Sequence, residues 1–491
     1  MKRKLRINGH SHLLPYPEEI PQFLKDKEIF WVDDERKYML QKGWKRPVTD
    51  SSFFLDEKLG WMERNKIDHA VVLNLSQLYG NGLRLEEMKH ALKFQNDFNA
   101  KVQQNHPSKF TCGFVVHPGF INGALWEIKR CVEELGMRVL CLPTHYMDSI
   151  GQWRCIFDEE NDPIFELANE YKLAIEVHPY DGDKMIKLAN TAWRFHLVWM
   201  LAQCGDAYHF YTLNGMQERY PNIRTCFAHG GQLAQMNLGR RIQGFDGRPD
   251  LFEGKTHPRK AVGHKNIYFD TLVHDTDSLK LTFERQGTKQ VIMGLDDPYP
   301  LGEMESDAQS SYPGKILDLA KERGLITDKE YDDIWEHNVL NWLFGDDEKA
   351  KEDLEWFWKS VDEDIGIIWD KPYSKILNTS NGVAWSKWFE DGKTNIYKSS
   401  VEKFAKINPE KIAYHFVSED GCTSSVSYCE LDSKVSKLAN GLKSLGVRKG
   451  DIVAIYLPMM EEAILAILAA SKIGAVQTVI FSGYSSESLH I

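Results

Sequence analysis

The sequence lacks the segments that carry a protein into or across a membrane. Its 491 residues contain no apolar run near 18 residues and no basic stretch followed by an apolar one at the N-terminus, so neither a membrane span nor a secretory signal is expected. Basic residues are in the minority, because 60 Lys and Arg stand against 71 Asp and Glu. Since phosphate binding needs a basic face, we expect a cytoplasmic protein with neither a membrane nor a nucleic acid as partner.

Cysteine is scarce, and its placement argues against a disulfide framework. Eight cysteines are present and none forms a C-x-x-C pair. Cys112, Cys141 and Cys226 lie in apolar, strand-like runs. A reducing cytoplasm keeps such thiols reduced, so we expect buried free thiols in place of disulfides or a zinc knuckle.

Short apolar runs alternate with helical patterns from about Leu5 to Gly294. Most of these runs are apolar throughout, which is typical of strands buried in a parallel sheet. Eight such strands joined by helical crossovers predict an α/β fold, specifically a (β/α)₈ TIM barrel. An open doubly wound sheet is the alternative, although no G-x-G-x-x-G motif follows the first run. The eight runs are residues 6–13, 69–76, 110–118, 138–145, 173–179, 224–231, 266–273 and 291–297.

The character of the chain changes after a helical stretch at 327–344. We assign residues 1–346 to the barrel, 347–353 to a charged linker and 354–491 to a second unit. The second unit begins aromatic-rich, and its later α/β pattern reads as a strand at 451–458, a helix at 460–474 and a strand at 476–482. No sheet of useful size is complete in this unit, so we expect an incomplete α/β unit with an exposed strand edge.

Residues that can bind a metal stand at several strand ends. His10 and His12 are two apart in the first strand and therefore point the same way. His178 ends the fifth strand, His229 the sixth and Asp296 the eighth. Because the carboxyl ends of barrel strands meet on one face, these residues suit Zn²⁺ with a position left for water. Taken alone, two nearby histidines such as His10 and His12 are more often surface or hydrogen-bonding residues than metal ligands.

The first unit resembles the amidohydrolase superfamily in these strand-end residues. Several longer stretches of its sequence are similar to those of the decarboxylases that act on 2-amino-3-carboxymuconate 6-semialdehyde. The resemblance implies one divalent metal ion on His10, His12, His178 and Asp296, with His229 as the catalytic acid or base. No lysine closes the fourth strand, so a second, bridged metal is not expected. The matching stretches are GHSHLLP, VHPYDG, CFAHGG, GRPDLF, LVHDTDSLKL and GLDDPYPLGE.

The same resemblance implies arginines that bind a dicarboxylate substrate, because a guanidinium pairs with a carboxylate bidentately. Arg46 is expected in a loop before the helix that contains LDEKLGWMERN. Arg240 and Arg248 are expected to reach the neighbouring subunit's pocket, which implies a homodimer. One departure is visible, since His196 stands near the position of the family's pocket tryptophan. His117 and His145 are expected to pack around the site.

Residues 354–491 resemble the N-terminal part of an acetyl-CoA-synthetase-type acyl-CoA ligase. WDKPYSKIL, WFEDGKTNIY and the run from SYCELDSK to FSGYSSESL carry the likeness. The phosphate loop, ribose-binding aspartate and catalytic lysine of such ligases are not among these residues, so we expect this unit not to activate an acyl group.

Three functions remain open at this point. The first is decarboxylation of 2-amino-3-carboxymuconate 6-semialdehyde in tryptophan or 3-hydroxyanthranilate catabolism. The second is decarboxylation of an aromatic acid, or a hydrolysis, on the same barrel, because a fold does not fix a reaction. The third is an acyl-CoA ligase or a non-catalytic scaffold.

Overall fold

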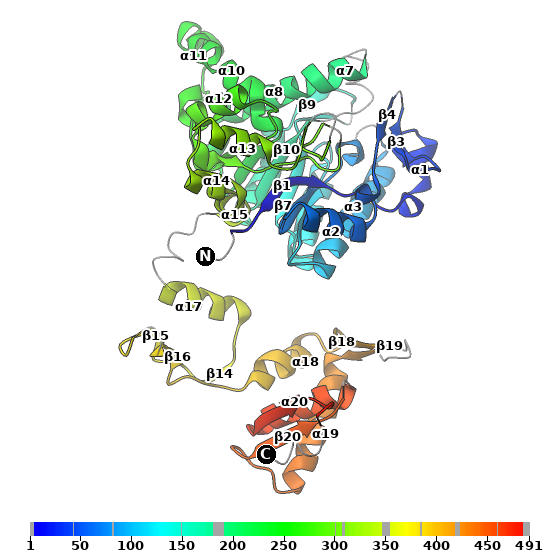
Figure 1. The fold of residues 1–491 in the computed structure, drawn as a ribbon, viewed down its shortest axis with the longest axis vertical. Coiled ribbons are helices and arrows are strands. Elements are labelled where there is room, and N and C mark those ends of the chain that lie inside the picture. The colour runs from blue at the N-terminus through cyan, green and yellow to red at the C-terminus, as the bar shows by residue number, and fades with distance from the viewer. Residues whose placement is uncertain are drawn as a thin grey trace. The chain divides into compact units, whose positions relative to one another are not determined.

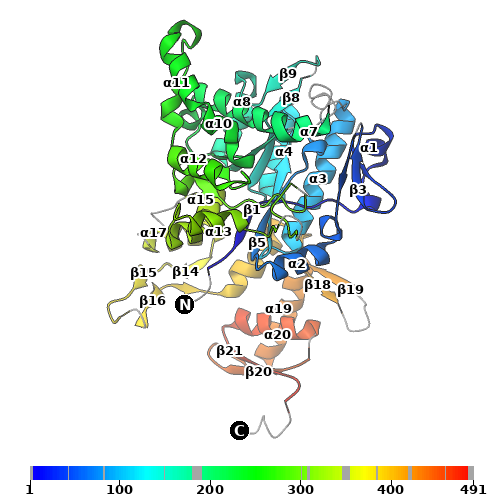
Figure 2. The same ribbon diagram turned by 45° about the horizontal axis from the view of Figure 1, so that its top comes forward.

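A computed structural model of the chain forms two compact units, residues 1–346 and 347–491 (Figure 1, Figure 2). Among the residues that it describes, no helix combines the length and apolar character needed to cross a bilayer. The predicted linker at 347–353 lies outside them. The described residues are 4–42, 44–80, 83–148, 150–179, 191–299, 301–306, 310–345, 354–382, 385–417, 423–458 and 460–484.

The first unit is built on one eight-stranded parallel sheet whose strands neighbour each other in chain order. The first strand meets the segment after the last one, where the Gly9 amide donates to the Met293 carbonyl at 2.7 Å and Ser11 bridges to Asp297. The sheet therefore closes, which confirms the predicted barrel and excludes the open doubly wound sheet. Its strands are β1 (Ile7–His12), β5 (His69–Leu73), β6 (Phe110–Val115), β7 (Val139–Pro143), β10 (Ala174–His178), β11 (Arg224–Phe227), β12 (Ile267–Asp270) and β13 (Val291–Ile292).

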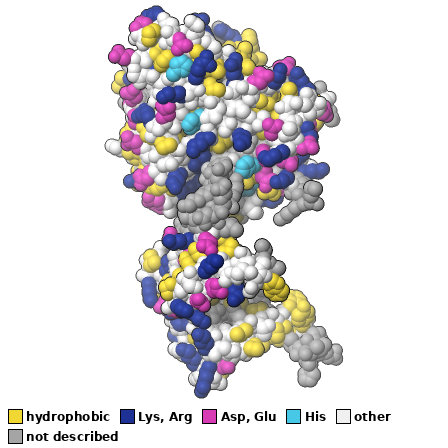
Figure 3. All heavy atoms as spheres, turned by 90° about the vertical axis from the view of Figure 1, so that its left-hand side faces the viewer, with side chains coloured by type: hydrophobic (Ala, Val, Ile, Leu, Met, Phe, Trp, Pro, Cys, Tyr) yellow, Lys and Arg dark blue, Asp and Glu magenta, His cyan; other side chains and the backbone are white. Residues whose placement is uncertain are grey.

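Helices cover the outside of this sheet (Figure 2) and bury its outward-facing side chains in the main hydrophobic core. On the face drawn in Figure 3, acidic and basic side chains of the first unit are intermixed. The helices are α1 (Gln22–Asp26), α2 (Leu55–Arg64), α3 (Leu85–Asn105), α4 (Ile121–Lys129), α5 (Asp162–Glu170), α7 (Ala192–Arg194), α8 (Met200–Leu213), α9 (Met216–Arg219), α10 (Gln232–Met236), α11 (Leu238–Gly247), α12 (Thr276–Gln286) and α13 (Lys315–Glu322).

An antiparallel sheet is inserted between β1 and α2. It comprises β2 (Trp31–Val32), β3 (Tyr38–Gln41) and β4 (Trp44–Pro47). Arg46 lies in β4, paired with Met39, so its predicted place in a loop is wrong. The strand pairing holds the backbone of Arg46 in place, which an isolated loop would not do. A second small pair, β8 (His145–Met147) and β9 (Trp153–Cys155), follows β7.

The helix predicted over 327–344 is in fact two helices, α14 (Asp328–Trp335) and α15 (His337–Phe344). Thr327 and Glu330 form a capping box at the start of α14, and Glu336 breaks the helix with φ −124° and ψ −72°. The change of direction lets α15 cover the base of the barrel. There, Trp342 joins a buried cluster with inward-facing strand residues and donates from Nε1 to the Ile175 carbonyl at 3.3 Å.

The second unit has its own small core between α19 (Tyr428–Ser444) and α20 (Glu461–Ile473). The strands β20 (Ile452–Tyr456) and β21 (Val476–Ile480) pair in parallel on either side of α20 in the chain, as the sequence pattern predicts. Ile452 is 74% and Val479 61% exposed, so this pair leaves apolar side chains in solvent. The remaining elements are α17 (Leu354–Ile365), β14 (Trp369–Lys371), β15 (Lys375–Asn378), β16 (Lys387–Glu390), β17 (Lys393–Thr394), α18 (Lys403–Ile407), β18 (Ile412–Val417) and β19 (Thr423–Ser427).

The described cysteines are free thiols, as predicted. Six of them, including Cys112, Cys141 and Cys226, are buried in the barrel unit. Cys429 is exposed, contrary to the expectation of burial, because it lies on a helix of the small second unit.

We predict that Trp342→Ala destabilises the barrel unit by about 3–5 kcal/mol, because it removes a large, fully buried side chain and leaves a cavity. Phe344→Ala on the same helix is the matched control, since Phe344 is 63% exposed and its loss is expected to stay within about 0.5 kcal/mol. Urea unfolding followed by far-UV circular dichroism measures both. Equal midpoints for the two variants would contradict the assigned role of α15.

Candidate metal centre

Three strand ends of the barrel bring four ionisable side chains to one buried place. His10 and His12 project from β1 and are each 2% exposed. His178 ends β10, and Asp296 follows β13 by four residues with a left-handed φ of 51°. All four are buried. The convergence expected from the barrel topology is therefore present in the structure.

The distances within this group match those between the ligands of one small cation. His10 Nε2 and His12 Nε2 are 3.1 Å apart, and Asp296 Oδ1 lies 3.1 Å from His12 Nε2 and 3.6 Å from His10 Nε2. Zn–N bonds of about 2.0–2.1 Å in a tetrahedron separate the ligand atoms by about 3.3–3.4 Å. A ligand atom of His178 lies within 4.8 Å of those of His10 and His12. The spacing fits a single ion.

The other ring nitrogen of each histidine has an acceptor, which fixes the tautomer. Nδ1 of His10 lies 2.8 Å from Asp270 Oδ2, that of His12 lies 3.2 Å from the Leu73 carbonyl, and that of His178 lies 2.8 Å from the Pro179 carbonyl. Donation from Nδ1 directs the Nε2 lone pairs toward the shared space, as in metal-binding histidines generally. The donor set therefore fits a divalent metal.

Asp270, at the end of β12, organises the site, although it was not among the residues expected from the sequence. It accepts from His10 Nδ1, from the His229 amide at 3.0 Å and from the Gly230 amide at 2.7 Å. One buried carboxylate thus orients His10 and the turn that carries His229. Its position at the end of the strand in NIYFDTLV is a signal that could have identified it.

The charges around His10 favour its protonated form when no metal is bound. Burial lowers its pKa, but the hydrogen bond to Asp270 and the charges of Asp296, Asp270 and Glu176 raise the pKa to about 9. Burial raises the pKa of Asp296, yet its hydrogen bond to His12 and the charge of His10 hold it well below the ordinary value. Burial lowers the pKa of His12 and of His178. His12 and His178 are therefore neutral and able to coordinate.

His229 lies beside the group but is not part of it. It opens a short turn after β11 with φ 56°, and its ring centre lies 5.2 Å from that of His178. Its Nε2 is buried without a hydrogen-bond partner among the described residues, and burial lowers its pKa to about 4.

Below the group, Glu176 is buried with no partner for either oxygen among those residues, and burial raises its pKa to about 8. Glu176 was not among the residues expected from the sequence, because it lies within the apolar strand AIEVH.

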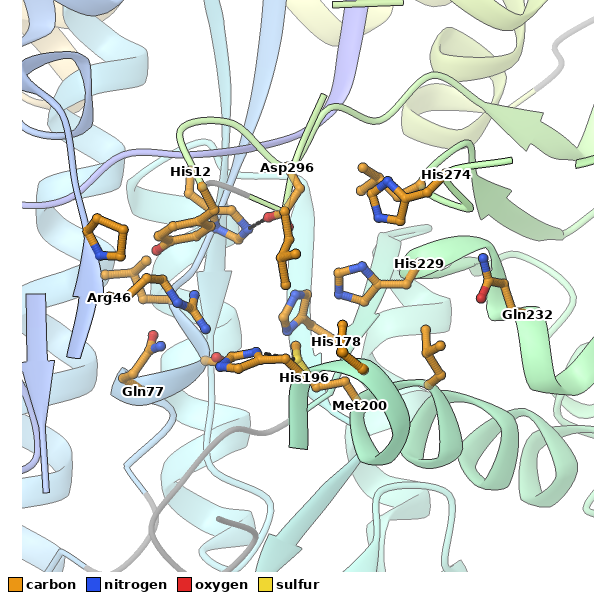
Figure 4. A pocket seen from close by; sticks show the side chains of 18 of the residues that line it. His12, Arg46, Gln77, His178, His196, Met200, His229, Gln232, His274 and Asp296 are labelled. Atoms are coloured by element: carbon orange, nitrogen blue, oxygen red, sulfur yellow. Dashed lines mark hydrogen bonds and ion pairs between the residues drawn. The ribbon is translucent and has the colours of Figure 1, made fainter. Parts of the chain in front are cut away.

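A cavity of about 350 Å³ opens above these side chains (Figure 4). His12, His178, His229 and Asp296 line one side, and Arg46 points into the cavity from β4, with its guanidinium carbon 4.6 Å from the centre of the Tyr299 ring. His196 also lines the cavity, with Nδ1 3.2 Å from Met200 Sδ. An anionic ligand would therefore meet a cation opposite the histidine cluster.

The other predicted arginines do not line this cavity. Arg240 and Arg248 are exposed on and after α11, and Arg248 forms a bidentate pair with Asp250. Their expected reach into a neighbouring subunit stays a prediction. His145 forms a hydrogen bond with Asp206 and stacks on Trp153. His117 accepts a hydrogen bond from the Gly119 amide. Both histidines are outside the residues that line the cavity, in line with a packing role.

We predict that binding of Zn²⁺ or Mn²⁺ releases about one proton near neutral pH, because His10 is protonated below its pKa of about 9 and must free Nε2 to coordinate. The apparent affinity should rise with pH up to that value. Titration calorimetry in buffers of different ionisation enthalpy measures the release. Asp270→Asn should release less, since it removes the hydrogen bond that raises this pKa. No proton release by the wild-type protein would contradict the assignment of His10.

Family models divide the chain at the same place as the structure. The model described as amidohydrolase matches residues 83–326. The model of the acetyl-coenzyme A synthetase N-terminus matches residues 347–399, and that of AMP-binding enzymes matches residues 401–491. The first match lies within the barrel unit, and the other two lie in the second unit.

Curated relatives follow the same division. The 2-amino-3-carboxymuconate-6-semialdehyde decarboxylase of Dictyostelium discoideum is 28% identical over 330 residues, which cover 65% of this chain and 87% of the relative. The acetyl-coenzyme A synthetase of Cupriavidus taiwanensis is 41% identical over 143 residues, or 29% of this chain. The chain spans 21% of that synthetase's length.

A solved structure supports the fold of the barrel unit. The 5-carboxyvanillate decarboxylase of Novosphingobium aromaticivorans, complexed with manganese and 4-hydroxy-3-methoxy-5-nitrobenzoic acid, aligns with a TM-score of 0.56 at 17% identity. The alignment covers 69% of this chain and 96% of that structure. With its closed barrel, its buried histidine cluster and this family match, the first unit of the chain resembles the amidohydrolase family, and the second unit resembles the N-terminal region of acetyl-coenzyme A synthetases.

Proposed function

We propose that the first unit is a metal-dependent decarboxylase that converts 2-amino-3-carboxymuconate 6-semialdehyde into 2-aminomuconate 6-semialdehyde without oxidation. The observation that carries the proposal is the convergence of three histidines and Asp296 beneath a cavity that also contains Arg46. The name of the Dictyostelium relative supports the substrate. The reaction would belong to tryptophan or 3-hydroxyanthranilate catabolism in the cytoplasm.

His10, His12, His178 and Asp296 would hold one divalent ion. The nitrogen-rich donor set favours Zn²⁺, and manganese in the Novosphingobium structure makes Mn²⁺ the second candidate. When bound, such an ion lowers the pKa of a coordinated water toward neutrality. The fourth strand of the barrel, β7, ends in Pro143. Because it supplies no lysine to bridge a second metal, we expect a single ion.

His229 is the residue placed to move a proton. Its Nε2 has no hydrogen-bond partner among the described residues and lies beside the cluster, so it can bond a substrate or a water molecule. Decarboxylation breaks the bond between carbon and carboxylate, releases CO₂ and requires a proton at the carbon left behind. Because burial lowers its pKa to about 4, His229 is a neutral imidazole near pH 7 and can take a proton from a water molecule and pass it to that carbon.

Arg46 would bind a substrate carboxylate and hold the bond to be broken near His229. Its guanidinium is half-buried against the Tyr299 ring, which limits its motion, and a guanidinium can bind a carboxylate bidentately. A second carboxylate needs a second cation. We assign that role to Arg240 or Arg248 of a homodimer partner, since both are exposed outside the cavity of their own subunit.

Decarboxylation of an aromatic acid is the second candidate. His196 lines the cavity near the position expected for a tryptophan in the first candidate's family, and this changes the substrate-facing wall. A phenolic acid with one carboxylate would need Arg46 but no cation from a partner. The two candidates therefore differ in their dependence on Arg240 and Arg248.

The proposed function predicts that the purified protein removes the chromophore of 2-amino-3-carboxymuconate 6-semialdehyde with equimolar CO₂ release. Chelation should abolish this activity, and added Zn²⁺ or Mn²⁺ should restore it. His229→Asn should keep the metal and lower kcat by about 10²–10⁴-fold, because it removes the group that accepts the proton and passes it on. His106→Asn, outside the cavity, is the matched control. Turnover of 5-carboxyvanillate but not of the semialdehyde would favour the second candidate, and full activity after verified metal removal would overturn both.

If an arginine of the partner subunit completes the site, two inactive variants should restore activity when they are mixed. Arg46→Ala and Arg240→Ala should each lower kcat/KM strongly without loss of metal. After mixing and subunit exchange, half of the dimers carry one of each chain, and one of their two sites has both arginines. About a quarter of wild-type activity should return. Lys37→Ala, an exposed cation beside β3, is the control for Arg46. If Arg240→Ala keeps full activity by itself, the test is repeated with Arg248→Ala. If neither mixture recovers activity, binding of the substrate across the dimer is contradicted.

A further inference from the structure

We propose that Lys58 is a positioning residue of the metal centre, which ties the strand carrying His10 and His12 to the segment carrying Asp296. Lys58 lies on α2, outside the barrel, and its side chain is 0% exposed. The inference rests on the proposed metal site and goes beyond it, because Lys58 does not line the cavity.

The barrel closes here between β1 and the segment that follows β13, and we call this closure the seam. β13 contains only two residues, Val291–Ile292, so the sheet is closed by the irregular segment that follows. The amide of Asp296 donates to the His10 carbonyl at 2.8 Å, and the His12 amide donates to the Asp297 carbonyl at 2.7 Å. Three of the four residues that would hold the metal, His10, His12 and Asp296, therefore lie where the backbone closes the barrel.

The ammonium of Lys58 crosses this seam. It donates to Ser11 Oγ at 2.8 Å and to the His12 carbonyl at 3.1 Å on β1, and it pairs with the Asp297 carboxylate on the other side. An ammonium has three N–H donors, and each has an acceptor here. Two of the contacts lie on or beside His12, and the third lies on the neighbour of Asp296.

Asn8 on β1 completes the connection. Its amide nitrogen donates to Asp297 Oδ1 at 2.6 Å, while its oxygen accepts from the His10 and Leu295 amides, both at 3.1 Å. The Asp297 carboxylate is thus held by Lys58 at one oxygen and by Asn8 at the other. This fixes the backbone on both sides of Asp296.

Stability alone does not explain a buried ion pair at this position. Removing two charges from water is costly, and well-packed apolar residues often replace such a pair without loss of stability. A pair that bonds the backbone of metal ligands has a geometric role available, since partners of metal ligands control affinity. The pair between Arg130 and Glu127 is also buried but bonds no residue of the centre, which makes it a matched comparison.

The test separates positioning from charge balance. Lys58→Met should lose both folding stability and metal affinity, since it leaves Asp297 buried without its cation. Lys58→Met combined with Asp297→Asn removes both charges, so stability should return toward wild type. The affinity for Mn²⁺ and Zn²⁺ should nevertheless stay about 10–100-fold weaker, because Ser11 and His12 have lost their donor. Urea unfolding of the metal-free protein and calorimetric titration with each metal alone provide the two readouts.

Glu127→Gln combined with Arg130→Met is the control and should keep wild-type metal affinity. If the Lys58 double variant does not fold, Lys58→Leu with Asp297→Asn replaces it under the same criterion. A folded double variant with wild-type metal affinity would overturn the inference and leave the proposed function standing. A wild-type protein that binds neither metal would overturn the proposed function and this inference together.

Discussion

Closure of the eight-stranded sheet is the constraint on which the candidate centre depends. Strand ends that are up to 286 residues apart in the chain, from His10 to Asp296, reach the same place only because the sheet is a closed barrel. The closure is made by backbone hydrogen bonds at His10, His12 and the segment after β13. The fold and the centre therefore share hydrogen bonds. At the base of the barrel, α15 joins a buried apolar cluster with residues of the strands.

The centre also concentrates negative charge where water is excluded. Asp270 and Asp296 raise the pKa of His10, and Glu176 adds to this when it is ionised. Buried carboxylates require a cation nearby, and protonated His10 provides it when no metal is bound. A divalent ion would replace that proton and satisfy the same carboxylates. The electrostatics and the ligand spacing thus favour the same occupant.

The two units of the chain carry separate cores and separate family relationships. Every described residue that lines the cavity falls between His12 and Leu301, so the proposed reaction is built from the first unit. The second unit packs α19 against α20 and leaves apolar residues of β20 and β21 exposed. Its similarity to acetyl-coenzyme A synthetases covers about a fifth of their length.

Local patterns in the sequence determined the strands, their parallel arrangement and the residues at their carboxyl ends, because buried strands are recognisable from short runs and a barrel fixes which ends meet. His10, His12, His178 and Asp296 could be named on that basis. Only the tertiary structure decided the rest, since it depends on contacts between distant segments. Asp270 and Glu176 gain their roles from neighbours on other strands, Lys58 reaches the seam from a helix on the outside, and Arg46 lies in an added sheet. The break at Glu336 had no strong local signal, because the direction of α15 is set by the apolar base of the barrel that it covers.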